Sequence, residues 1–475
     1  MVGVDAGTTV TKAVAFDPAG VPLARVARPT ALHRVADGWY EQDADQVVDS
    51  VRQVLAELTA AVDRPVAGVG VTAQGDGLWL VDPAGRPVRP AISWMDGRAA
   101  SIVERWAAGG LLESAYRRTG GLMFPGASGP LLAWLDEHEP AALDRAATAA
   151  YCKDVVLQRL TGERATDPSD ASMPFLDPRT RRYDDELLAA CGLAHRRDLL
   201  APVHDTPYGR LLPSPADGTG LPAGTPVVAA PYDLPASAWG AGVTRPGDGL
   251  LILGTTLACQ VLVDRPDAAG EPCGFVLSTW QPDRWLRALP AMVGTAALDW
   301  VLRLVGADLT DLPRLLAQGR SDGLTVLPYL AESGERAPFV APRARGRIDG
   351  LHLGTGPADL VRAVCEAVAY SARHCLTTAG LTGELVACGG GLASTAWAQI
   401  LADVLDRPVR VLAGQEVGAL GAALAARRVL GEPATAPADA GRVHHPDPVA
   451  ARRYADGYAR YLDHVANARA GWGQV

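Results

Sequence analysis

The segment VGVDAGTTVTKAVAFD spans residues 2–17, and LLILGTTLACQVLVD spans residues 250–264. Each consists of an apolar stretch, Gly-Thr-Thr, a second apolar stretch, and an aspartate ten residues after the glycine. Apolar runs on both sides of residues suited to a tight turn predict a β-hairpin in each segment. Because the two segments lie about half the chain apart, we interpret them as matching parts of two copies of one unit.

Helical and strand patterns alternate behind each predicted hairpin. Residues 43–62 carry apolar side chains at helical spacing, and a buried strand pattern follows at 66–74. The second half repeats this order, with a helix predicted over 360–376, a strand and a glycine loop over 383–391, and another helix over 394–405. Such alternation favours α/β domains, in which helices cover a central sheet.

The duplication predicts two domains, 1–245 and 246–475, joined by the segment 243–250. We expect the first domain to bind a small substrate and to carry one phosphate-binding hairpin. The second domain carries the matching hairpin and the glycine loop. A terminal helix is predicted over 448–470, with tyrosines at 454, 458 and 461 on a packing face.

Composition excludes several classes of protein. The 475 residues include 44 Lys and Arg against 53 Asp and Glu, for a net charge of −9, and no arginine-rich run is present, so nucleic acid is not an expected partner. The two lysines, Lys12 and Lys153, do not follow a glycine, and a P-loop is therefore absent. Seven cysteines without a CxxC pair predict reduced core residues. With no expected leader or membrane span, we expect a cytoplasmic protein.

The first hairpin turn offers groups suited to a metal-bound triphosphate. Asp5 ends an apolar strand, and Thr8 and Thr9 follow within the turn. A carboxylate suits Mg²⁺, and hydroxyls with turn amides suit phosphoryl oxygens. The alternative is a plain β-turn in which these side chains bond only to the local backbone.

Two further loops offer similar donors. One is Gly254-Thr255-Thr256 in the second hairpin, and the other is Gly389-Gly390-Gly391, with Ser394 at the start of the next helix. A glycine loop between a strand and a helix lets the backbone approach a ligand. Glycine triplets also occur at tight packing points, which is the alternative. Three such loops favour a nucleotide clamped between duplicated domains.

Candidate substrate-side residues lie in the first half. Asp233 ends an apolar strand and could accept a proton from a substrate hydroxyl, or it could instead cap a helix over 235–241. A loop after the strand at 66–71 supplies amide, carboxylate, guanidinium and aromatic groups suited to a hydroxyl-rich ligand, and the alternative is a solvated loop with its tryptophan packed inward. Its residues are Gln74, Asp76, Trp94, Asp96 and Arg98.

With these motifs in order, the chain resembles the FGGY family of carbohydrate kinases along essentially its whole length. VDAGTT (4–9) and LGTT (253–256) resemble the two phosphate motifs of the family, and VACGGGLASTAWAQILADVL (386–405) resembles its adenosine loop. Gly346 to Leu351, followed by DLVRAVCE (359–366), fits its long C-terminal signature, with Cys365 where a larger apolar residue is usual.

The resemblance implies two actin-like, ribonuclease-H-like domains with ATP and a sugar in the cleft between them. It implies that Asp233 is the catalytic base and that Asp5 holds Mg²⁺. The implied substrate-binding set is Gln74, Asp76, Trp94, Asp96, Arg98, Tyr232 and Asp233. The implied ATP-binding set is Thr8, Thr9, Lys12, Gly254, Thr255, Thr256, Gly294, Gly389, Gly390, Gly391 and Ser394.

The expected activity is therefore ATP-dependent phosphorylation of a small sugar or polyol, such as a xylulose-type or erythritol-type substrate. Where xylulokinases typically have Gln-Met-His-Gly, this chain has Gln74-Gly75-Asp76-Gly77, and Leu234 follows the catalytic position, where a polar residue is common. The segment 74–82 looks closer to erythritol and related polyol kinases. The alternative is a non-catalytic, actin-like, sugar-sensing regulator. The sequence leaves the substrate, the phosphorylated hydroxyl and a possible homodimer open.

Overall fold

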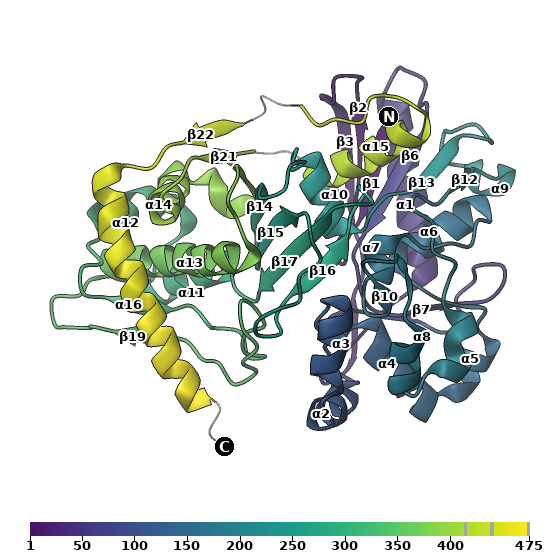
Figure 1. Ribbon diagram of the computed structural model, residues 1–475. Coiled ribbons are helices and arrows are strands. Elements are labelled where there is room, and N and C mark those ends of the chain that lie inside the picture. Colours follow the sequence, from purple (N-terminus) through teal and green to yellow (C-terminus); the bar gives the residue numbers. More distant parts are fainter. Residues whose placement is uncertain (413–415, 438–440, 473–475) are drawn as a thin grey trace.

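The computed structural model describes residues 1–412, 416–437 and 441–472. It consists of two lobes, each built on a β-sheet flanked by helices (Figure 1). The first sheet has the strand order β12-β13-β6-β1-β2-β3, and the second has the order β16-β17-β15-β14-β20-β21-β22.

The bounds of these strands place both predicted hairpins in the sheets. The first sheet contains β1 (Val2–Ala6), β2 (Val10–Phe16), β3 (Pro22–Pro29), β6 (Val69–Ala73), β12 (Tyr208–Arg210) and β13 (Pro226–Ala229). The second contains β14 (Gly249–Leu253), β15 (Leu257–Val263), β16 (Phe275–Ser278), β17 (Trp285–Ala291), β20 (Leu385–Cys388), β21 (Val409–Val411) and β22 (Arg442–His444).

The two sheets share one plan, which confirms the duplicated α/β architecture. β1 pairs antiparallel with β2 and parallel with β6. β14 likewise pairs antiparallel with β15 and parallel with β20. In each sheet the first strand therefore sits between its hairpin partner and a parallel strand. Its carboxyl end meets the turn, where the predicted phosphate-binding groups lie.

Helices cover the sheets through the apolar faces that the sequence shows. α1 (Ala44–Ala61) begins after Asp43, whose side chain accepts hydrogen bonds from the backbone N–H of Asp45 and Gln46, and it buries a face that includes Val51 and Leu55. α13 (Pro357–Ala379) packs on the second sheet with α11 (Thr295–Val305) and α14 (Thr395–Leu405). The helices predicted at 43–62, 360–376 and 394–405 are thus confirmed.

One helix from the second half of the chain packs on the first sheet. α15 (Val417–Val429) contacts β1, β6 and α10 (Asp233–Gly240). A Cβ at Gly3 would lie 1.7 Å from the carbonyl oxygen of Ala419, and one at Gly70 would lie 1.8 Å from that of Ala422. Only glycine leaves room for this approach. The predicted range 246–475 therefore contains a helix that completes the core of the first lobe.

The last helix, α16 (Pro448–Trp472), runs along the outer edge of the second lobe (Figure 1). Tyr454 and Tyr461 on this helix are buried, and the Tyr461 hydroxyl lies 2.8 Å from that of Tyr329. The predicted packing face is confirmed. All seven cysteines are buried and unpaired. Within the described ranges, no helix combines the length and apolar character that crossing a bilayer requires.

The remaining elements lie around these two sheets. They are β4 (His33–Ala36), β5 (Trp39–Gln42), β7 (Trp79–Val81), β8 (Ala91–Ile92), α2 (Ala100–Ala108), α3 (Leu111–Thr119), α4 (Ser128–His138), α5 (Pro140–Arg145), β9 (Thr148–Ala150), α6 (Cys152–Thr161), α7 (Pro168–Ala171), β10 (Leu176–Asp177), β11 (Arg182–Tyr183), α8 (Asp185–Ala190), η1 (Ala194–Leu199), α9 (Pro213–Ala216), η2 (Leu309–Asp311), α12 (Leu312–Gln318), β18 (Thr325–Leu327), β19 (Arg347–Asp349) and η3 (Gly390–Ala393).

Candidate active site

Asp5 lies in β1, directly before the first hairpin turn, and α15 covers it. A Cβ at Gly418 of α15 would lie only 3.1 Å from Asp5 Oδ2, so the glycine leaves room for the carboxylate. Burial raises the pKa of Asp5 to about 6; Lys12 opposes this rise and Glu416 adds to it. Lys12 Nζ and Glu416 Oε2 form an ion pair at 3.0 Å. Lys12, which the sequence predicts to bind ATP, is therefore paired with Glu416, and both lie near Asp5.

Thr8 connects the first turn to the predicted substrate loop. Trp94 Nε1 donates to Thr8 Oγ1 at 2.9 Å, and Thr8 Oγ1 donates to Gln74 Oε1 at 2.8 Å. Gln74 Nε2 donates to Gln42 Oε1 at 2.7 Å, and Gln42 Nε2 donates to the Thr8 carbonyl at 3.0 Å. The plain-turn alternative fails for Thr8, because its hydroxyl bonds to residues far away in the sequence. Sequence reasoning missed Gln42, which carries no motif.

Asp76 occupies an unusual backbone position in the same loop. Its φ is 57°, in the left-handed region that few non-glycine residues adopt. Its Oδ1 is buried and lacks a hydrogen-bond partner among the described residues. Burial raises the pKa of Asp76 to about 7, and the charge of Arg336 opposes this rise. An unpaired carboxyl oxygen held by a strained backbone is a common feature of ligand sites.

Arg336 comes from the second half of the chain and was not predicted. Its guanidinium lies 5.7 Å from the ring centroids of both Trp94 and Phe124, and its Nε donates to the Pro290 carbonyl at 3.0 Å. The neighbouring Glu335 carboxylate accepts a bond from the backbone N–H of Met292 at 3.0 Å. These contacts hold a cation from the second lobe over the substrate loop of the first. No local pattern in the sequence indicates this, because the partners are more than 200 residues apart.

Asp96 and Arg98 pair with each other. Their side chains are 0% and 1% exposed, and Arg98 Nε donates to Asp96 Oδ1 at 2.9 Å. Arg98 also contacts Glu41 at 2.8 Å, and Asp96 Oδ2 accepts from the Tyr40 N–H at 2.6 Å. This geometry favours a positioning role for the pair, which fixes the loop that carries Trp94, over the direct sugar contact that the sequence suggested.

Asp233 is the first residue of α10, and Tyr232 takes the N-cap position. The helix-cap alternative for Asp233 is therefore wrong. Burial raises the pKa of Asp233 to about 8, and the charges of Asp5 and Asp76 add to the rise. Tyr232 is buried, and its backbone N–H donates to Ser169 Oγ at 2.9 Å. Two other predicted carboxylates, Asp5 and Asp76, thus lie within electrostatic reach of Asp233.

The second hairpin turn lies against the start of α11. Thr255 and Thr256 are exposed. The Gly294 N–H donates to the Thr255 carbonyl at 2.9 Å, and the Thr295 N–H donates to the Gly254 carbonyl at 2.7 Å. The predicted residues Gly254, Thr255 and Gly294 therefore form one cluster. The side chains of Thr255 and Thr256 are exposed to solvent beside it.

The glycine loop joins this cluster. Gly389 has a φ of 111°, and a Cβ there would lie 2.4 Å from the Leu253 carbonyl oxygen, so the position requires glycine. Gly391 is buried against Leu253, whereas a Cβ at Gly390 would meet no atom within 4 Å. Ser394 Oγ accepts from the Trp397 N–H at 3.3 Å and caps α14. The Ser394 hydroxyl is therefore engaged in the N-terminal cap of α14, whereas Gly390 borders open space.

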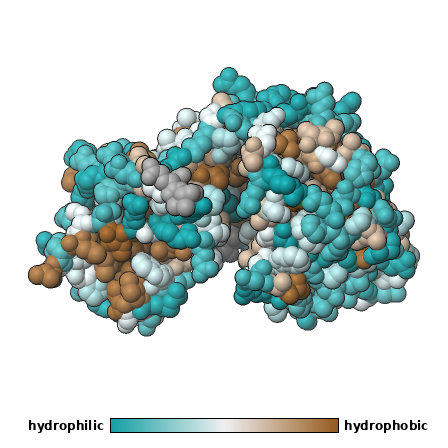
Figure 2. All heavy atoms as spheres, turned by 90° about the horizontal axis from the view of Figure 1, so that it is seen from below, coloured by the Kyte–Doolittle hydropathy of each residue, from teal (hydrophilic) through white to brown (hydrophobic). Residues whose placement is uncertain are grey.

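Seen from below, the molecule has a notch between the two lobes (Figure 2). No group of three or more His, Cys, Asp or Glu in the described part of the chain is arranged to hold a metal ion by itself. In nucleotide sites Mg²⁺ usually takes one or two carboxylates together with phosphate oxygens and water. Asp5 is the carboxylate that the sequence predicted for this role. The cluster around Asp233 can hold and accept protons, because its carboxyl pKa values lie near neutral.

Known proteins are similar to this chain in sequence and fold over most of its length. An erythritol kinase of Brucella abortus (strain 2308) is 36% identical over 91% of this chain and 87% of its own length. A xylulose kinase of Escherichia coli (strain K12) is 32% identical over 89% and 88%. The crystal structure of xylulose kinase from Rhodospirillum rubrum is 32% identical, with a TM-score of 0.89 over 100% of this chain and 99% of that one.

The family model for the N-terminal domain of FGGY carbohydrate kinases matches residues 1–240, and the model for the C-terminal domain matches residues 251–429. Together they cover both lobes and the motifs of the candidate site. The chain therefore belongs to the FGGY family of carbohydrate kinases.

Proposed function

We propose that this protein transfers the γ-phosphoryl group of ATP to a hydroxyl of a small, uncharged sugar or polyol of about four to six carbons, with Asp233 as the base. Membership of the family makes the chain a carbohydrate kinase and implies the use of ATP. The proposal adds the substrate class, the metal and the residue roles, and it places the reaction in the cytoplasm.

The observation that carries the proposal is the environment of Asp233. It stands at the start of α10 with a pKa raised to about 8, close to the substrate loop of Asp76 and to Asp5. A base whose pKa lies near the working pH can take the proton of an attacking hydroxyl as the bond to phosphorus forms. Since phosphoryl transfer asks little covalent chemistry of a protein, positioning and charge neutralisation supply most of the rate.

The residues fit a magnesium nucleotide. Asp5 would hold Mg²⁺, which would neutralise phosphate charge when bound. The exposed Thr255 and Thr256, the open Gly390 and the turn amides would contact the nucleotide. Lys12 supplies positive charge near Asp5, and Arg336 supplies it near Asp76. Thr8 and Ser394 contribute less directly, since their side chains are already engaged in the loop network and the helix cap.

The substrate loop favours a polyol. The Asp76 carboxyl, with a pKa near 7 and an oxygen without a partner, can accept hydrogen bonds from hydroxyls. Gln74 and Trp94, which both bond to Thr8, would add an amide group and an aromatic ring to the site. The similarity to an erythritol kinase supports this proposal, and we therefore rank tetritols and pentitols first among the substrates to test.

The test is a coupled ADP-release assay over erythritol, xylitol, arabinitol, xylulose, ribulose, glycerol and gluconate. We expect one of the polyols or ketoses to stimulate ATP turnover. Asp233→Asn should lower that turnover by roughly 10²–10⁴-fold, the usual contribution of a general base. The matched control is Asp283→Asn, because Asp283 is exposed and pairs only at the surface with Arg284. Substantial sugar-dependent turnover in Asp233→Asn would contradict the proposal, and no stimulation by any substrate would favour a non-catalytic regulator.

A further inference from the structure

A cavity of about 600 Å³ opens in the second lobe, away from the candidate active site. Strand β15 connects the cavity to the second hairpin turn of the candidate active site. It begins at Leu257, beside that turn, and ends at Val263 in the cavity wall. Its seven residues span about 20 Å at roughly 3.3 Å per residue. The cavity volume falls within the roughly 300–1,000 Å³ of small-molecule sites.

Most charges in the cavity wall pair with each other. Arg265 lies 3.6 Å from Asp264, and Arg469 Nη2 lies 2.5 Å from Glu271 Oε1. Asp267 accepts a hydrogen bond from the backbone of its own loop. Two of these three carboxylates therefore pair with arginines, and oxygens of the carboxylates at the rim can accept hydrogen bonds from hydroxyls.

Arg287, which lies in β17, is the exception. It lines the cavity, and it is only 7% exposed. Its Nη2 donates to the Tyr116 hydroxyl at 2.7 Å and to Cys273 Sγ at 3.5 Å, both neutral groups. Its Nη1 has no hydrogen-bond partner, and no carboxylate lies within ion-pair distance of its guanidinium among the described residues. A buried cation without a counter-ion is costly, and proteins rarely keep one without a use.

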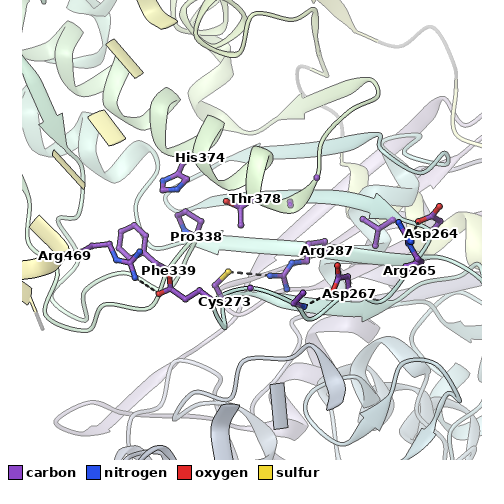
Figure 3. A pocket seen from close by; sticks show the side chains of 16 residues that line it. Asp264, Arg265, Asp267, Cys273, Arg287, Pro338, Phe339, His374, Thr378 and Arg469 are labelled. Carbon is purple, nitrogen blue, oxygen red and sulfur yellow. Dashed lines mark hydrogen bonds and ion pairs between the residues drawn. The ribbon is translucent and has the colours of Figure 1, made fainter. Parts of the chain in front are cut away.

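A second residue of the cavity lining, on α13, also has an unpaired nitrogen. His374 also lines the cavity, and its Nδ1 is buried without a partner in the described part of the chain. Burial, with help from the charge of Arg469, lowers the pKa of His374 to about 4, so its ring is neutral at pH 7. Figure 3 shows Arg287 on the sheet side of the cavity and His374 on the helix side. A ligand between them would meet one cation and one neutral ring nitrogen.

We propose that this cavity is a second ligand site, which binds a small hydroxylated organic anion through Arg287. The anionic group is a phosphate monoester or a carboxylate, because either one matches the fork of a guanidinium. Because Nη1 is buried, the proposal requires the end of the Arg287 side chain to rotate when the ligand binds, so that Nη1 reaches the anionic group. The hydroxyls of the ligand face the carboxylates of Asp264 and Asp267 at the rim. None of the residues assigned to ATP or to the sugar takes part.

The site adjoins a contact between the two lobes. Tyr116, which accepts the bond from Arg287, belongs to α3 and donates to the Cys273 carbonyl at 3.2 Å. The next residue, Arg117, donates to the Ala268 carbonyl at 2.6 Å. A ligand bound to Arg287 would therefore be connected, through the Arg287–Tyr116 hydrogen bond, to the contact between the two lobes.

The test is calorimetric titration of the full-length protein, without nucleotide, with glycerol 3-phosphate, gluconate and inorganic phosphate, and with glycerol as the uncharged control. We expect at least one of the two hydroxylated anions to bind more tightly than inorganic phosphate, and any heat from glycerol to be the same in the parent and in Arg287→Gln. A preference for glycerol 3-phosphate or for gluconate identifies the anionic group. Absence of binding by both organic anions overturns the proposal.

Two variants locate the binding. Arg287→Gln should weaken the affinity for the anion at least tenfold. Thr378→Trp should do the same by filling the cavity from an exposed position on α13, without touching Arg287. Arg284→Gln, which removes a charge from a residue outside the cavity lining, should bind as the parent does. Circular dichroism establishes that each variant is folded. Unchanged affinity in both Arg287→Gln and Thr378→Trp would place the anion elsewhere and overturn the proposal.

Discussion

Lys153 Nζ lies 2.7 Å from Asp170 Oδ2, and the lysine is completely buried. The same Nζ lies 2.9 Å from Asp154 Oδ1 and 2.9 Å from Asp167 Oδ1. One cation thus serves three carboxylates, and burial raises the pKa of Asp170 well above its usual range.

This buried cluster leads to the segment that carries the proposed base. Asp167 Oδ1 accepts from Ser169 Oγ at 2.9 Å, and Ser169 Oγ accepts from the backbone N–H of Tyr232 at 2.9 Å. Tyr232 directly precedes Asp233. We infer that Lys153 positions Asp233 through this chain, so that a lysine far from the chemistry supports the site.

Replacing Lys153 should destabilise the protein strongly. Lys153→Met leaves three buried carboxylates without their cation, and breaking a buried ion pair in this way costs about 3–5 kcal/mol. Urea denaturation measures the loss. Lys12→Met is the matched control, because the Lys12–Glu416 pair is partly exposed and should contribute only ~1 kcal/mol or less. Equal losses in the two variants would contradict the importance of the buried cluster.

The activity should depend on the protonation of Asp233. Its pKa is raised to about 8, and only the ionised carboxylate can accept a proton. We therefore expect kcat/KM, which reports the free enzyme, to rise with pH and to reach half of its maximum near pH 8. Steady-state rates at saturating ATP between pH 6 and pH 9.5 measure this. The Asp283→Asn control should give the same curve, and a flat profile over that range would argue against Asp233 as the base.

The same group should lower stability at high pH. The pKa of Asp233 is higher in the folded protein than the usual value near 4, so the folded state binds its proton more tightly. The resulting stabilisation is complete below about pH 4 and is lost as pH rises through 8. Asp233→Asn removes this loss. The melting temperature of the variant minus that of the parent should increase from pH 5 to pH 9, reaching the equivalent of roughly 4 kcal/mol, because about three pKa units lie between pH 5 and the pKa of about 8. A difference that is independent of pH would be inconsistent with a raised pKa.

Arg336 should support substrate binding from the second lobe. Its guanidinium contacts the Trp94 and Phe124 rings and lies near Asp76. Arg336→Gln removes the charge and should lower kcat/KM at least about tenfold, or about 1.4 kcal/mol. Arg336→Lys keeps the charge but loses the planar contact, and it should recover only part of the activity.

Kinetics over a range of sugar concentrations separates the roles of Arg336. A rise in KM with kcat unchanged indicates that the residue contributes to ground-state binding, and an equal fall in kcat and kcat/KM indicates stabilisation of the transition state. Parent-like kcat/KM in Arg336→Gln would remove Arg336 from the site. Arg284→Gln is the control, because the side chain of Arg284 bonds to Asp283 at the surface, outside the candidate site.

Gly418 should be needed to leave room for the carboxylate of Asp5, the proposed metal ligand, and should not be needed for folding. A Cβ at this position would lie 3.1 Å from Asp5 Oδ2, tight enough to displace the carboxylate. Gly418→Ala should therefore raise the Mg²⁺ concentration required for half-maximal activity several-fold. Since alanine favours a helix over glycine by about 1 kcal/mol, the unfolding free energy should not fall in parallel. Gly109→Ala, where a Cβ meets only ordinary contacts, is the control. Parent-like Mg²⁺ dependence in Gly418→Ala would count against Asp5 as the metal ligand.

Local patterns predicted the elements that carry the site. The two Gly-Thr-Thr hairpins, the helices that follow and the glycine loop at 389–391 all lie where the sequence indicated them. Such features depend on neighbouring residues, so periodicity and turn chemistry reveal them. The sequence predicted the roles of individual side chains less well. Asp96 and Arg98 have the chemistry of sugar-binding groups, yet their burial against each other favours a positioning role.

The sequence by itself determined the duplicated α/β plan, the absence of a P-loop lysine and the family, because these follow from short runs of residues and their spacing. Tertiary structure alone decided how the halves interlock. It placed α15 of the second half on the first sheet, Arg336 over Trp94, and Lys153 among three aspartates. The physical reason is that burial and charge pairing depend on residues brought together from distant parts of the chain. The shifted pKa values near Asp233 arise only once α10, α15 and the substrate loop exclude water around them.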